Sequence, residues 1–232
     1  MSEVIRIAVL GSTGLIGTRI LEEVRYRPDV RVIAIARREF EFPHDARLEC
    51  FVAEPEKWGD VIAGLQPDCI INALGTTWKR AGRDEEAFRA VDQHLVVETA
   101  KAAREAGIER MITISSVGAN PSTKNFYLRV KGEVERDLTK LRFKRLDIIR
   151  PGLLKGRRVD DLRFGESLAK IASPLVDPFL GGAMSKYRSI PGKTVAHAAL
   201  GLATRKAAGR FTHEHDAIIR AARDWLARAD KV

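Results

Sequence analysis

Two short stretches of the chain carry residue types that could do chemistry together. In the first, Gly11, Gly14 and Gly17 recur at every third position between an apolar run and an amphipathic run. In the second, Tyr127 and Lys131 stand four residues apart, so on a helix they would share one face. Glycines at this spacing let the backbone approach a dinucleotide's diphosphate, and a phenol beside an ammonium can exchange a proton with a substrate. The two stretches together predict a reaction that uses a dinucleotide cofactor.

The glycine stretch can bind phosphate only if a strand precedes it and a helix follows it. Residues 4–10 are an apolar run of the kind that forms a buried parallel strand, and a helical apolar spacing begins near Leu15. The free N–H groups and the dipole of that helix would hold the diphosphate, and two hydroxyl side chains would add donors. We therefore expect the phosphates to lie against Gly11, Ser12, Thr13, Gly14, Leu15, Ile16 and Gly17.

The end of the next predicted strand bears on the choice of cofactor. Residues 30–36 are a second apolar run, and where an acidic residue would bind the ribose of NAD the sequence has Arg37 and Arg38. Guanidinium groups there suit the 2′-phosphate of NADP, although two solvated arginines in an arginine-rich chain are the simpler alternative. We expect NADPH or NADP to be preferred over NAD.

The order of the apolar runs predicts one α/β domain over residues 1–232, with a Rossmann-like, doubly wound parallel sheet. Further strands are expected at residues 48–52, 69–74, 111–114 and 146–150, with a short edge strand at 209–212. Helices are expected at residues 58–65, 85–106, 126–141, 194–207 and 217–229. Residues 152–193 change in character and should form most of a small cap on the substrate side.

Composition narrows the remaining function classes. The net charge of +9 is spread over most predicted helices and mixed with acids, so we expect a solvated basic surface and no nucleic-acid partner. No apolar run is long enough to cross a bilayer and no signal-peptide pattern is present, so we expect no membrane partner and a cytoplasmic protein. Cys50 and Cys69 fall in apolar runs and are expected to be buried thiols, and we propose no metal site.

These motifs resemble the short-chain dehydrogenase/reductase superfamily, in its extended and atypical branch. The glycine spacing is of the extended type, and Tyr127 with Lys131 fits the Tyr-x-x-x-Lys pair of that family. Within the branch, residues 74–77, 115–119, 127–135 and 150–154 look like the Tat-interactive-protein oxidoreductases. The likeness covers nearly the whole chain and implies a Rossmann fold that binds NADPH.

The resemblance also implies roles for individual residues. Tyr127 would donate or accept the proton with Lys131 as its partner, and Ser116, with Ser115 as the alternative, would polarise a substrate carbonyl. Asp92 replaces an asparagine that supports a proton path in many relatives, which puts that relay in doubt. Further cofactor contacts are expected from Leu74, Gly75, Pro151 and Leu154.

The resulting prediction is an NADPH-dependent oxidoreductase that reduces a small carbonyl compound or a related substrate. The alternative is an NADPH-sensing module that regulates a protein partner with little or no catalysis, as some members of the branch do. A homodimer is possible for either. Clustered basic residues of the cap could face an acidic substrate, although exposed arginines are the commoner explanation: Arg157, Arg158, Arg163, Lys186 and Arg188.

Overall fold

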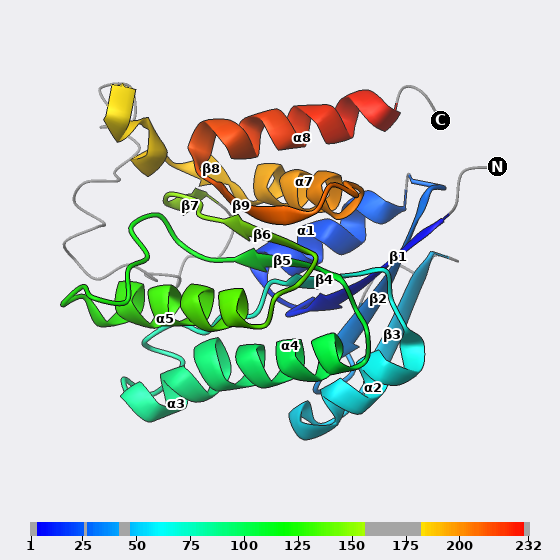
Figure 1. The fold of residues 1–232 in the computed structure, drawn as a ribbon, viewed down its shortest axis with the longest axis horizontal. Helices are drawn as coiled ribbons and strands as arrows, with labels where there is room; N and C mark the ends of the chain where they lie inside the picture. The colour runs from blue at the N-terminus through cyan, green and yellow to red at the C-terminus, as the bar shows by residue number, and fades with distance from the viewer. Residues whose placement is uncertain (1–3, 26, 42–46, 156–181, 230–232) are drawn as a thin grey trace.

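A seven-stranded, wholly parallel sheet forms the middle layer of the protein (Figure 1). The computed structural model describes residues 4–25, 27–41, 47–155 and 182–229. The strand order is β3-β2-β1-β4-β5-β6-β9, so it reverses between β1 and β4, where α/β proteins of this kind open a crevice at the carboxyl ends of the strands. The strands are β1 Ile5–Leu10, β2 Val30–Ala36, β3 Leu48–Val52, β4 Cys69–Asn72, β5 Arg110–Ile114, β6 Arg145–Ile149 and β9 Gly209–His213.

Helices cover both faces of the sheet (Figure 1). One face carries α1 Leu15–Val24, α7 Gly192–Ala203 and α8 His215–Ala229, and the other carries α2 Trp58–Leu65, α3 Glu85–Arg89, α4 Leu95–Glu105 and α5 Phe126–Lys140. Because both faces are covered, the central strands read as continuous apolar runs, and residues 7–10 of β1 are fully buried. The predicted α/β Rossmann-like fold is confirmed.

Two predicted elements end or break where tertiary contacts intervene. The fourth strand stops at Asn72 because its side-chain amide donates to Thr113 Oγ1 at 3.0 Å and accepts from the Leu74 N–H at 3.2 Å. The single helix expected over residues 85–106 is instead α3, a π-helical turn at Ala90–His94, and α4. Both changes occur beside the crevice at the carboxyl edge of the sheet.

The segment predicted to form the cap is described only in part. Its described elements are β7 Leu154–Lys155, paired in parallel with β8 Ile190–Pro191, and a 3₁₀ helix at Gly182–Tyr187. Lys186 and Arg188 belong to this part, whereas Arg157, Arg158 and Arg163 lie outside the described residues. In the described parts of the chain, no helix is both long and apolar enough to span a bilayer.

The two cysteines should differ sharply in reactivity. Burial raises the pKa of Cys69 on β4 to about 12, and burial also raises the pKa of Cys50 on the partly exposed strand β3. The thiolate is the form that reacts with an aromatic disulfide reagent. At about pH 8 we therefore expect one thiol of the native protein, that of Cys50, to react slowly, and the thiol of Cys69 to react only after denaturation. A Cys50→Ser protein serves as the control, and rapid native reaction of that protein would contradict the prediction.

Candidate functional site

A cleft runs along the carboxyl edge of the sheet and has two adjoining parts. The first, here called the tyrosine pocket, is small, with a cavity volume of about 20 Å³, and includes Tyr127 in its lining. The second, here called the arginine pocket, is an open groove of about 730 Å³ whose lining includes Arg37 and Arg38. Ala73 and Leu74, just after β4, line both parts. A ligand longer than either part could therefore lie across the end of β4.

The glycine turn between β1 and α1 is closely packed. Gly11 has φ +80°, and a Cβ there would lie 2.6 Å from the carbonyl carbon of Ala73. A Cβ on Gly17 would lie 2.3 Å from the Gly11 carbonyl oxygen, so Gly17 fixes α1 against the turn and lines neither pocket. Gly14 is the N-cap of α1 and offers no side-chain hydrogen bond to it. The first turn of α1 is therefore open toward the cleft, as an anion site requires.

The other residues predicted for the phosphates divide between the two pockets. Ser12 and Thr13 line the arginine pocket, whereas Leu15 and Ile16 line the tyrosine pocket. Ser12 is 1% exposed, and its Oγ has no hydrogen-bond partner among the described residues. A buried hydroxyl without a partner is costly, and a bound phosphate oxygen would satisfy it.

The predicted adenosine side and the predicted reacting side of the cofactor are at opposite ends of this cleft. Arg37 and Arg38 follow β2 and line the arginine pocket with Gly75. Pro151 and Leu154, after β6, line the tyrosine pocket. The structure thus distributes the predicted contacts over two adjoining pockets.

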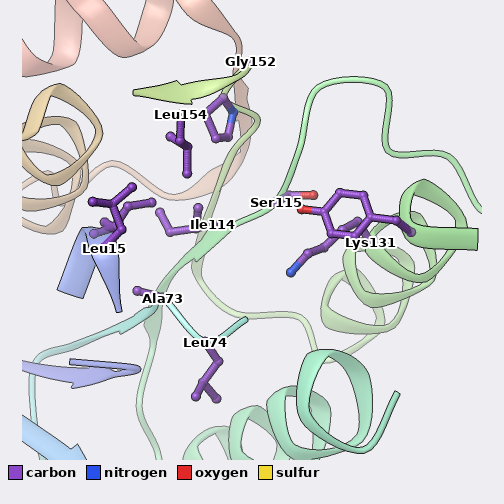
Figure 2. A pocket seen from close by; sticks show the side chains of 11 residues that line it. Leu15, Ala73, Leu74, Ile114, Ser115, Lys131, Gly152 and Leu154 are labelled. Atoms are coloured by element: carbon purple, nitrogen blue, oxygen red, sulfur yellow. The ribbon is translucent and has the colours of Figure 1, made fainter. Parts of the chain in front are cut away.

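Helix α5 positions Tyr127 and Lys131. Asn125 caps the helix by accepting a hydrogen bond from the Leu128 N–H at 3.0 Å. Gly132 lets the helix approach the 120–121 backbone, where a Cβ would lie 2.4 Å from the Asn120 carbonyl carbon. Both functional side chains line the tyrosine pocket, and Figure 2 shows Lys131 across the pocket from the apolar side chains of Leu15 and Leu154.

Lys131 forms a buried ion pair with Asp92. Its Nζ lies 2.8 Å from one Asp92 carboxylate oxygen, and the side chains are 8% and 0% exposed. The other carboxylate oxygen accepts a hydrogen bond from the Thr76 N–H at 2.6 Å. Asp92 therefore joins the lysine to the loop after β4.

The structure brings Ser115, and not Ser116, to the tyrosine pocket. Ser116 is 1% exposed, its Oγ donates to the Val117 carbonyl at 3.3 Å, and it lines neither pocket. Successive residues at a strand end face opposite ways, so only one of the two serines can point into the pocket. Figure 2 shows Ser115 there, and it replaces Ser116 in the candidate site.

A buried carboxylate behind Ser115 is a feature that the sequence analysis missed. Glu135 accepts hydrogen bonds from Ser115 Oγ and from two nitrogens of Arg150, with Arg150 Nε at 2.9 Å. The hydrogen bonding to Glu135 raises the pKa of Arg150 above its ordinary value. Glu135 lies four residues after Lys131 on the same face of α5, and this spacing was the available signal. Since the serine proton is donated to Glu135, Ser115 presents lone pairs to the pocket.

Comparison with known proteins gives a consistent family. Residues 7–134 match the model of the NAD dependent epimerase/dehydratase family. The chain is 37% identical over 160 residues to "Protein FMP52, mitochondrial" of Saccharomyces cerevisiae, a match that covers 68% of this chain and 69% of that protein. The matched residues include the glycine turn and the Tyr127–Lys131 pair within the family model.

Solved structures share the fold at low identity. A putative NAD-dependent epimerase/dehydratase from Bacillus halodurans superposes with a TM-score of 0.68 at 21% identity, over 94% of this chain and 99% of that chain. MoeE5, solved in complex with UDP-glucuronic acid and NAD, superposes with a TM-score of 0.68 at 14% identity, over 89% of this chain and 75% of that chain. At these identities the likeness establishes the fold.

The relatives also correct one expectation. The predicted cytoplasmic location is contradicted, because fungal relatives at 34–37% identity are named as mitochondrial proteins. The prediction had relied on the absence of a secretory signal and of a membrane span, and neither absence distinguishes the cytoplasm from an organelle interior.

Proposed function

Because the chain belongs to the NAD-dependent epimerase/dehydratase family, within the extended short-chain dehydrogenase/reductases, we propose that it is an NADP-dependent oxidoreductase acting on a small carbonyl compound or a related substrate. One observation carries the proposal: Tyr127 and Lys131 line a pocket that adjoins, at Ala73 and Leu74, the groove lined by the glycine turn and its arginines. Together the two could hold both the phosphates and the reacting end of a dinucleotide.

The residues present fit such a cofactor. The first turn of α1 and the buried, unpartnered Ser12 hydroxyl would hold the diphosphate, and Arg37 and Arg38 would hold the 2′-phosphate. Leu15, Ile16, Pro151 and Leu154 would border the nicotinamide end. When bound, the cofactor supplies hydride to carbon or takes it up.

The polar residues of the tyrosine pocket then have distinct roles. Tyr127 gives a proton to the substrate oxygen during reduction and takes one during oxidation. Lys131, held by Asp92, is the expected ligand of the nicotinamide ribose. Ser115, whose proton is donated to Glu135, accepts a hydrogen bond from the hydroxyl form of the substrate. Tyr127 is thus the proton donor to a carbonyl in this scheme.

A carbonyl-compound library tests the proposal with NADPH consumption as the readout. We expect at least one small aldehyde or ketone to be reduced, with NADH consumed more slowly than NADPH. Titration of NADP⁺ into the same protein, followed by calorimetry, measures binding independently of any substrate. Failure to bind either nicotinamide dinucleotide would overturn the proposed function.

Removal of the two arginines after β2 should change the nucleotide preference. In the Arg37→Ala, Arg38→Ala double variant we expect the Kd for NADP⁺ to rise about tenfold to hundredfold and the Kd for NAD⁺ to change less than about threefold, because only NADP⁺ carries the phosphate that these groups bind. Arg31→Ala, an exposed arginine near the other end of β2, is the control for lost charge. Equal weakening of both nucleotides would contradict the NADP preference.

A further inference from the structure

A third arginine, Arg80, lines the arginine pocket together with Arg37 and Arg38. Arg80 lies in the loop between β4 and α3, and it lines the groove together with Gly75 and Thr76. In the sheet, β1 lies between β2 and β4. The glycine turn that follows β1 is therefore flanked by Arg37 and Arg38 on the β2 side and by Arg80 on the β4 side.

The loop that carries Arg80 is fixed by several contacts. The Thr76 N–H donates to Asp92, and the Arg80 N–H donates to Thr77 Oγ1 at 3.1 Å. Trp78 packs edge-on against Phe126, with ring centroids 5.4 Å apart. The loop ends at Asp84, whose carboxylate caps α3 by accepting from the Ala87 N–H at 2.6 Å. The backbone at Arg80 is thus held in place beside the groove before any ligand arrives.

The guanidinium of Arg80 has no acidic partner in the part of the chain that the structure describes. Among the described residues, no carboxylate forms an ion pair with Arg37, Arg38 or Arg80, whereas many of the other arginines here pair with acids. Three guanidinium groups around one groove, beside an uncapped helix N-terminus and the buried Ser12 hydroxyl, make a site for more than one phosphate group.

We infer that Arg80 binds the diphosphate of the dinucleotide, from the β4 side of the glycine turn, while Arg37 and Arg38 bind the 2′-phosphate. This inference rests on the proposed function and assigns the diphosphate and the 2′-phosphate to different arginines. The diphosphate is common to NAD⁺ and NADP⁺, so Arg80 contributes equally to both, whereas the arginines after β2 discriminate between them.

Substitution of Arg80 tests the assignment by calorimetry on the full chain. We expect Arg80→Ala to raise the Kd for NADP⁺ and for NAD⁺ by the same factor, about tenfold, which leaves their ratio unchanged. Lys79→Ala removes the same charge one position earlier, from a residue that does not line the groove, and should change either Kd less than about twofold. Arg80→Gln, which retains a long polar side chain, replaces the alanine variant if the latter melts at a lower temperature.

Each other outcome is decisive. If Arg80→Ala and Lys79→Ala weaken binding equally little, Arg80 is a solvated side chain and only this inference fails. If Arg80→Ala weakens NADP⁺ alone, the residue binds the 2′-phosphate and the diphosphate assignment is wrong. If the wild-type protein binds neither nucleotide, the proposed function fails and this inference fails with it.

Discussion

The Tyr127→Phe protein should lose turnover by about a hundredfold to ten-thousandfold while its Kd for NADP⁺ stays within about twofold of the wild-type value. The substitution removes one hydroxyl and retains the ring, which packs edge-on against Phe88 with centroids 6.0 Å apart. The N-cap of α5 at Asn125 is also unchanged. The loss would therefore report the missing proton and no change in the fold.

Tyr187→Phe provides the matched control, because it makes the same chemical change in the short 3₁₀ helix at Gly182–Tyr187, outside the lining of the tyrosine pocket. Both proteins should be compared in steady-state NADPH consumption and in calorimetry. Wild-type turnover by Tyr127→Phe would show that the assigned role is wrong. If the wild-type protein binds NADPH, reduces no carbonyl compound and captures a protein partner only when NADPH is bound, the nucleotide-sensing alternative is supported instead.

Asp92→Ala should lower the free energy of unfolding by about 3–5 kcal/mol, the cost typical of removing one partner from a buried ion pair. The substitution leaves the Lys131 ammonium buried without its carboxylate and leaves the Thr76 N–H without its acceptor. Asp92→Asn should cost less, because the amide oxygen can still accept one of these hydrogen bonds. Urea denaturation of the three proteins measures the difference.

The control for Asp92 is Asp60, which lies on the exposed surface of α2. Its only ion pair in the described structure is with Lys57 at 3.8 Å, and both side chains are more than 70% exposed. Asp60→Ala should change stability little, since exposed pairs contribute little. Equal stability of the Asp92→Ala and wild-type proteins would mean that the buried pair makes no net contribution.

Local sequence signals were sufficient for much of the fold. The strands at 30–36 and 48–52 have their predicted bounds, because apolar runs there are closed by turn residues and charges. The glycine turn, the arginines after β2 and the Tyr127–Lys131 pair were also recognisable from spacing alone.

Features that depend on distant contacts were not predictable in this way. The end of β4 depends on the hydrogen bond from Asn72 to Thr113, which are 41 positions apart in the sequence. Whether Ser115 or Ser116 reaches the tyrosine pocket depends on which serine faces α5, where Glu135 accepts a hydrogen bond from Ser115 Oγ. Arg80 entered the site because the sheet order places its loop beside the glycine turn.

The π-helical turn at Ala90–His94 sets the rotational phase between α3 and α4. An α-helix advances about 100° per residue. A wider turn therefore rotates the side chains of α3 about the helix axis relative to those of α4. Phe88 before this turn, Asp92 within it and Val96 after it are all buried. The π-helical turn thus carries the carboxylate that pairs with Lys131.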